Sequence, residues 1–173
     1  MNELPWSDAP AVAAPKENEA MAAVPFQSYL MAGFECSSHR RFDGKRIDMV
    51  AATRHDVFAL RDYARLSELG IQTSRDGLRW HLIESSPRRY DFTSVASQLD
   101  AARSAGVQVI WDLFHYGYPD GLNIFAPDFP DRFADFAAGF SRFHLSQTGR
   151  APWVVPVNEI SFFSWIAGDE GRF

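Results

Sequence analysis

From Phe26 onward, apolar runs of strand length alternate with segments in which apolar residues recur at helical spacing. The runs that predict strands are 26–36, 71–80, 107–116 and 153–163. Such alternation is typical of β-α units that build a parallel sheet. Pro156 lies inside the fourth run and has no N–H to donate to a neighbouring strand, so we expect a bend or a bulge there.

Helices are predicted between these strands. The first opens with Thr53 as its N-cap and Asp56 three residues later, and it buries the stripe Val57, Leu60 and Ala64. The second buries the stripe Phe92, Val95, Leu99 and Ala102. The third carries core phenylalanines at spacings of three, four and three, which are Phe133, Phe136, Phe140 and Phe143. Gly70 and Gly106 are expected to end the first two helices.

Composition limits what this domain can do. The 173 residues are 46% hydrophobic and 14% aromatic, enough for one domain over 26–173, preceded by a flexible Ala/Pro-rich arm over 1–25. The net charge of −5 and the absence of basic runs argue against nucleic acid and membrane surfaces as partners.

The chain also shows no signal peptide and no apolar run long enough to span a membrane. Cys36 is the single cysteine, so an intrachain disulfide is excluded and the cytoplasm is the expected location.

Polar residues stand at or near the ends of the four predicted strands. These residues are Glu35, Arg75, His115 and Glu159, at intervals of about 40 residues, the length of one β-α unit. Periodicity alone fits any α/β fold, but barrel enzymes place their chemistry at these strand ends. No G-x-G-x-x-G or P-loop is present, as a nucleotide-binding sheet would require. We therefore predict a TIM (β/α)8 barrel in part, with parallel strands in the order 1-2-3-4 and helices on the outer face only.

Several motifs resemble the retaining (β/α)8 glycosidases, most closely family 1, the β-glucosidase-like enzymes. The residues that carry this resemblance are "SRDGLRW", "LFHY" and "VNEI", in order and at the ends of predicted strands 2, 3 and 4. The segment "YDFTSVASQLDAARSAGVQVI" is also similar to the corresponding helix region of the wider superfamily. The resemblance covers about Leu30 to Gly168.

The resemblance implies roles for individual residues. Glu159 would be the catalytic acid/base, Asn158 would bind the sugar 2-hydroxyl, and Arg75 would orient the nucleophilic carboxylate. The residues implied in substrate binding are Glu35, His115, Tyr116, Trp80 and Trp165. The family usually has glutamine where Glu35 stands, and a carboxylate only accepts hydrogen bonds, so the glycone preference stays open.

Structural interpretations of the same residues stay open as well. Glu159 could be a solvated turn residue, Arg75 could simply pair with Asp76 or Asp112, and His115 could be a hydrogen-bonded structural histidine. Trp165 and the neighbouring phenylalanines could pack beneath a loop. The histidines show no metal-ligand spacing, so no metal is expected, and no other cofactor is expected either. The preference for phosphorylated substrates stays open, although no basic cluster suits a phosphate.

Only four β-α units are accounted for, whereas a complete barrel takes about 250 residues, and the family's nucleophile belongs to strand 7. We therefore expect an inactive N-terminal half-barrel of a saccharide-cleaving enzyme. Its open sheet edges would favour self-association. The alternative is a non-catalytic half-barrel that binds a saccharide or a protein.

Overall fold

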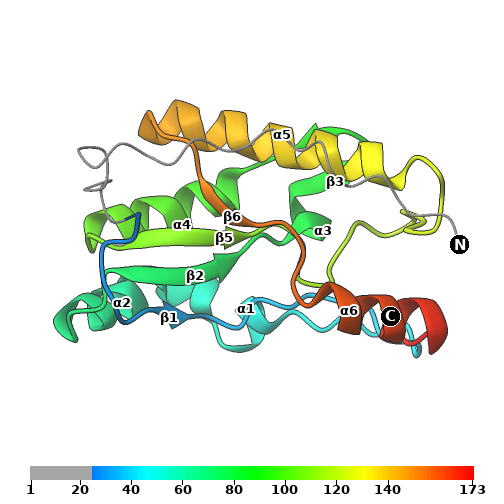
Figure 1. The fold of residues 1–173 in the computed structure, drawn as a ribbon, viewed down its shortest axis with the longest axis horizontal. Coiled ribbons are helices and arrows are strands. Elements are labelled where there is room, and N and C mark those ends of the chain that lie inside the picture. Colours follow the sequence, from blue (N-terminus) through cyan, green and yellow to red (C-terminus); the bar gives the residue numbers. More distant parts are fainter. Residues whose placement is uncertain (1–24) are drawn as a thin grey trace, which may run out of the picture.

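A computed structural model describes residues 25–173 (Figure 1). The arm predicted for residues 1–25 lies outside these residues except for Pro25. The centre of the fold is a parallel sheet whose strands lie in the order β1-β2-β5-β6. These strands are Ala32–Gly33, Thr73–Gly77, Gln108–Asp112 and Trp153–Val155.

The order β1-β2-β5-β6 differs from a consecutive 1-2-3-4 because two strands intervene in the chain, although these four strands lie within the four predicted runs in chain order. After β2 the chain adds the short helix α3 (Trp80–Ile83) and a separate antiparallel pair, β3 (Glu84–Ser86) and β4 (Arg89–Tyr90). The parallel strands are also shorter than the apolar runs that predicted them. An apolar run reports burial, and burial continues into the loops after the sheet pairing has ended.

The long helices all pack against one face of the sheet. Asp76 of β2 accepts hydrogen bonds from side chains of α2 (His55–Glu68) and α4 (Thr93–Ser104). Trp111, its neighbour on β5, contacts Phe140 of α5 (Phe129–Thr148). The opposite face carries Arg75 and its register partner Ile110. Within residues 25–173, the three long helices thus occupy the outer face, as predicted.

The first predicted helix is wrong in its start and in its buried face. Thr53 ends the short helix α1 (Met49–Ala52), whose N-cap is Asp48, and α2 begins two residues later. On α2, Val57 and Leu60 are 63% and 57% exposed. The buried residues are instead His55, Ala59 and Tyr63. This face is buried because His55 and Tyr63 form hydrogen bonds with the buried carboxylate of Asp76. These hydrogen bonds determine which side of α2 faces the sheet.

The other helical predictions are confirmed. On α4 the buried residues include Val95, Leu99 and Ala102, and on α5 Phe136 and Phe140 are fully buried. Phe133 and Phe143 pack against this core from its edge. Gly70 and Gly106 follow the helix ends with φ of 73° and 69°, the left-handed conformation that glycine tolerates.

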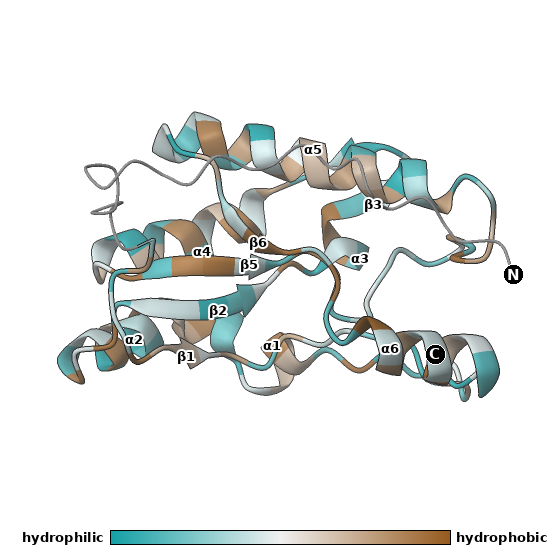
Figure 2. Cartoon of the chain, viewed as in Figure 1, coloured by the Kyte–Doolittle hydropathy of each residue, from teal (hydrophilic) through white to brown (hydrophobic). Residues whose placement is uncertain are grey.

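The strands differ in polarity, and β2 carries several buried polar residues. Figure 2 shows β2 in hydrophilic colours beside the more hydrophobic β5. Ser74 and Asp76 of β2 are nonetheless completely buried, so this strand carries polar groups through the middle of the fold. After β6 the chain bends at Pro156, as expected, and continues into α6 (Ile160–Phe163) and a wider turn of helix over Ser164–Asp169.

The start of the first predicted strand has another role. Residues 25–28 cross the N-terminal ends of the strands, where the Gln27 N–H donates to Thr73 Oγ1 at 3.0 Å. The Phe26 and Trp153 rings lie 5.4 Å apart. This segment therefore covers the sheet at the end opposite the candidate site. None of the helices within residues 25–173 has the length and apolar character to cross a membrane.

Candidate active site

A cavity of about 740 Å³ lies at the C-terminal ends of the strands. Backbone pairing continues past the strands and holds its walls, since the Phe34 N–H donates to Arg75 O and the Asn158 N–H donates to Phe114 O. The polar side chains that line the cavity include Glu35, Arg75, Asp112, His115, Asn158 and Glu159. The structure therefore brings together the residues predicted from four separate strand ends.

Arg75 occupies the floor of this cavity. Its Nε and Nη2 donate to the two carboxylate oxygens of Asp112, each at 2.8 Å, and Nη2 also donates to Asn158 Oδ1 at 2.5 Å. Burial raises the pKa of Asp112, but the hydrogen bonds from His115 and Arg75 outweigh burial and lower it. The ion pair between Arg75 and Asp112, one of the two pairings left open by the sequence, is therefore present. Asp76, the other candidate partner, lies on the opposite face of the sheet.

Asn158 connects the Arg75 guanidinium to two uncharged groups, His115 and Tyr116. Its Oδ1 accepts from Arg75, so its amide nitrogen must face the other way, where Nδ2 lies 3.0 Å from His115 Nε2 and 2.8 Å from the Tyr116 hydroxyl. Because Nδ2 donates, His115 Nε2 accepts, and the imidazole proton then belongs on Nδ1. The network thus sets both the amide orientation and the histidine tautomer.

Glu159 lies at the exposed rim of the site, and Tyr116, which is bonded to it, is buried. The Tyr116 hydroxyl donates to Glu159 Oε2 at 2.6 Å. Burial and this hydrogen bond together raise the pKa of Tyr116. Both residues adopt the left-handed conformation, with φ of 65° and 42°. Non-glycine residues in this region cost about 1–3 kcal/mol each and tend to occur at functional sites, which supports a functional reason for this rim.

Glu35 lies across the cavity from this rim. Its Oε1 accepts from the Ser37 N–H at 3.0 Å and is 3.7 Å from His115 Nε2. Burial raises the pKa of Glu35, but the hydrogen bonds from Ser37 outweigh burial, so the net pKa is lowered. Glu35 is therefore an ionised acceptor that can bind a hydroxyl group.

The two tryptophans predicted to bind substrate are placed elsewhere. Trp80 is completely buried in α3, where its ring lies 4.6 Å from Phe136 in a stacked arrangement and its Nε1 donates to Glu84 Oε2 at 2.6 Å. Trp165 is 48% exposed, beside Phe162, and does not line the cavity. Trp80 is therefore a core residue, because α3 turns it away from the cavity and under α5.

Sequence reasoning also missed lining residues, among them two aromatic rings. His39 and Phe173 stack at 4.1 Å and both face the cavity. Each comes from a segment without strand character, so periodicity gives no signal for either. Phe173 also lines a second cavity of about 500 Å³.

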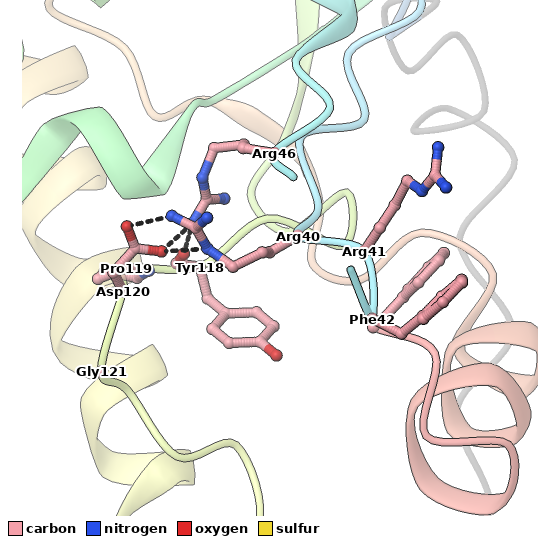
Figure 3. Close-up of a pocket in the computed structure, with 9 residues that line it drawn as sticks. Arg40, Arg41, Phe42, Arg46, Tyr118, Pro119, Asp120 and Gly121 are labelled. Atoms are coloured by element: carbon pink, nitrogen blue, oxygen red, sulfur yellow. Dashed lines mark hydrogen bonds and ion pairs between the residues drawn. The ribbon is translucent and has the colours of Figure 1, made fainter. Parts of the chain in front are cut away.

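That second cavity gathers three arginines of one short segment, Arg40, Arg41 and Arg46 (Figure 3). Arg40 and Arg46 both pair with Asp120, at 2.6 and 2.5 Å, and Arg41 pairs with Asp43 at 2.9 Å. No basic cluster suited to a phosphate is expected from the sequence, and these arginines stand together in the segment before α1. Each arginine nevertheless has a carboxylate partner, so the group is largely neutralised.

No protein-family model matches the chain, and no curated protein shows significant sequence similarity to it. Solved glycosidase structures do share its fold. A β-glucosidase from Exiguobacterium marinum matches with a TM-score of 0.59 at 17% identity, over 83% of this chain and 36% of that chain. A family 1 β-glucosidase from Thermotoga maritima, in complex with isofagomine lactam, matches with a TM-score of 0.56 at 18% identity, over 68% and 28%.

An exo-β-1,4-mannosidase from Opitutaceae bacterium strain TAV5 matches with a TM-score of 0.53 at 23% identity, over 70% of this chain and 23% of that chain. The chain therefore spans between 23% and 36% of the length of these structures. At these identities the similarity establishes the fold: an α/β arrangement with a parallel sheet, like part of the TIM barrel of these glycosidases.

Proposed function

We propose that this chain carries the acid/base half of a retaining, β-glucosidase-like glycoside hydrolase. In this proposal it forms the first four β-α units of an eight-unit barrel, and the cavity at the strand ends holds the glycone. The observation that supports it best is the connected network from Arg75 through Asn158 and Tyr116 to Glu159. The proposal accounts for polar residues from several strands meeting at one cavity.

Glu159 would protonate the glycosidic oxygen as the bond breaks and later take a proton from the attacking water. Its rim position suits this role, because a leaving group must depart toward solvent. The Tyr116 hydroxyl would hold one carboxylate oxygen of Glu159 and leave the other free to face the substrate. Tyr116 is thus a positioning residue in this proposal.

Asn158 and Glu35 would bind sugar hydroxyls. The Asn158 amide would interact with the 2-hydroxyl, and Glu35 would accept a hydrogen bond from a hydroxyl across the cavity. His115 would also contribute to binding the hydroxyls of the glycone. A site with three carboxylates, one of them paired with the single arginine, suits a neutral, polyhydroxylated ligand.

A retaining reaction also needs a second carboxylate about 5–5.5 Å from the acid/base. Asp112 is a poor nucleophile because Arg75 binds both of its oxygens. Glu35 is held by Ser37. We therefore assign the nucleophile to a residue outside 25–173, and Arg75 would orient it through the side of its guanidinium that faces the cavity.

The test is Glu159→Gln in the protein at its full coded length. Turnover of aryl β-glycosides with poor leaving groups should fall by about 100-fold or more, because they need protonation. Activated dinitrophenyl glycosides should fall much less in their bond-breaking step. Equal losses for both substrate types, or none, would exclude Glu159 as the acid. Binding of a glycoside without any turnover would favour the non-catalytic alternative.

A further inference from the structure

Three possible metal ligands meet at the inner wall of the cavity. Cys36 Sγ lies 3.1 Å from His115 Nδ1 and 3.5 Å from Asp112 Oδ2, and His115 Nδ1 lies 3.4 Å from the same Asp112 oxygen. Cys36 and Asp112 are each 1% exposed. The sequence spacing gave no sign of this group, because Cys36 comes from the loop after β1 and the other two from the end of β5.

The separations fit one tetrahedral ion. With bond lengths of about 2.3 Å to sulfur and about 2.0 Å to nitrogen and oxygen, a tetrahedral zinc ion places S about 3.5 Å from both N and O, and N about 3.3 Å from O. Two of the three observed distances already agree within about 0.1 Å. Only the Cys36–His115 separation must open, by about half an ångström.

We propose that Cys36, Asp112 and His115 form a site for a thiophilic divalent cation of the Zn²⁺ class. Thiolate, imidazole and carboxylate are the donors that zinc prefers, and three protein ligands with one open position is a common arrangement. Asp112 and His115 line the cavity, from which a water molecule would supply the fourth ligand.

The packing restrains the sulfur. A Cβ atom built on Gly77 would lie 2.3 Å from Cys36 Sγ and 2.6 Å from its Cβ, so the cysteine side chain fits tightly over this glycine. The thiol is therefore held in place for the ion without being free to swing into solvent. On binding, the Cys36 thiol loses its proton to solvent and the thiolate sulfur forms the bond to the ion, while Asp112 contributes the charge it already carries.

Arg75 limits the affinity. A carboxylate has about four lone-pair sites, so Asp112 can keep Arg75 and bind the cation as well, but the two positive charges oppose each other. Ligation through Nδ1 also places the imidazole proton on Nε2. That atom faces Glu35 Oε1 at 3.7 Å, the kind of acceptor that usually supports a ligating histidine.

The same proton conflicts with Asn158. Its Nδ2 donates to His115 Nε2 at 3.0 Å, so the amide must turn away once Nε2 carries a proton. Bound metal would therefore disturb the network assigned to the sugar. Under the proposed hydrolase function, Zn²⁺ therefore inhibits the enzyme and a chelator restores its activity. Only this inhibition rests on the proposed function; the metal site does not.

Titration with Co²⁺ tests the site directly in the full-length protein. Cys36 is the single cysteine within residues 1–173, so a cysteine-to-serine change at this position assigns any thiolate-to-cobalt charge-transfer absorption. We expect a band with tetrahedral Co²⁺ character that is displaced by Zn²⁺ and absent in Cys36→Ser. Asp112→Asn should weaken binding at least tenfold, whereas the control Asp120→Asn, at a carboxylate that also pairs with arginines, should leave it unchanged.

Absence of the band in the folded wild-type protein at millimolar Co²⁺, or its persistence in Cys36→Ser, would overturn the proposal. A band in wild-type protein decides for thiolate ligation even if a variant fails to fold. The spectrum requires no catalysis, so a band in a protein without hydrolase activity would contradict the proposed function and leave the metal site standing. Hydrolase activity that Zn²⁺ leaves unchanged despite the band would overturn the inhibitory coupling.

Discussion

Replacing Trp80 by alanine should strongly destabilise the protein, although this residue has the sequence context of a sugar-binding tryptophan. Its side chain is completely buried and stacks on Phe136, with Phe114, Phe129 and Phe133 around it. Its indole N–H donates to Glu84 Oε2. The change removes the centre of an aromatic cluster and leaves Glu84 with one donor fewer.

The magnitude follows from the size of the cavity left behind. Truncation of a buried tryptophan to alanine costs about 3–5 kcal/mol. Glu84 keeps the Arg132 guanidinium and the Arg88 N–H as donors, so little is added for its carboxylate. Against a total stability of about 5–15 kcal/mol, the loss is a large fraction. With a urea slope of about 2 kcal/mol per molar, the unfolding midpoint falls by about 2 M.

Urea unfolding of the full-length protein followed by circular dichroism measures this shift. Trp165→Ala is the matched control, because that ring is about half exposed and its truncation should cost no more than about 1 kcal/mol. Similar midpoints for the two variants would refute the buried position of Trp80. So would a Trp80→Ala protein of normal stability that had lost saccharide binding.

Three further predictions concern the site and its supports. Tyr116→Phe should lower kcat/KM for substrates with poor leaving groups by about 10- to 100-fold, because a hydrogen bond to a charged group contributes about 1.5–3 kcal/mol. The control Tyr118→Phe, in the neighbouring cavity, should leave kcat/KM unchanged. Equal effects of the two changes would contradict the role of Tyr116. Burial lowers the pKa of His55, but its hydrogen bonds to Asp76 and Asp62 outweigh burial and raise it, so its stabilising contribution is full below pH about 6.5 and is lost as the pH rises through the raised value. Urea midpoints from pH 5 to 9 should therefore fall more in wild-type protein than in His55→Gln, and parallel profiles would refute this. Gly117→Ala should lower the free energy of unfolding by about 1–3 kcal/mol, since the new Cβ would lie 2.0 Å from Ser38 Oγ. Gly168→Ala, which has open space around it, should leave the urea midpoint unchanged. An unchanged midpoint for Gly117→Ala would contradict the close packing of this loop.

The sequence predicts the sheet and its helices well where apolar spacing decides the structure. The stripes of α4 and α5 and the glycines after α2 and α4 are where the pattern puts them. The pattern fails for α2, because His55 and Tyr63 turn toward the buried Asp76 carboxylate, a partner that lies on another element. It also gives no sign of the β3–β4 pair, whose strands are two or three residues long.

The candidate site shows the same division. Residues at strand ends are predictable, because parallel strands bring their C-terminal ends to one edge, and Arg75, His115 and Asn158 meet there. The position of Trp80 is not predictable in this way, since the short helix α3 after β2 turns its side chain away from the cavity. The contact of Cys36 with His115 and Asp112 is beyond sequence reasoning as well, because it depends on the register between neighbouring strands.

The most direct test of the central claim is azide rescue of Glu159→Ala in the full-length protein, with an activated aryl β-glycoside as substrate. If Glu159 is the acid/base of a retaining reaction, the glycosyl-enzyme accumulates because no base activates water. Azide, which needs no base, then attacks the anomeric carbon and displaces the enzyme carboxylate. We predict that azide restores turnover and that the product is the β-glycosyl azide. Unimpaired turnover without azide, or an α-glycosyl azide as the product, would contradict the assignment.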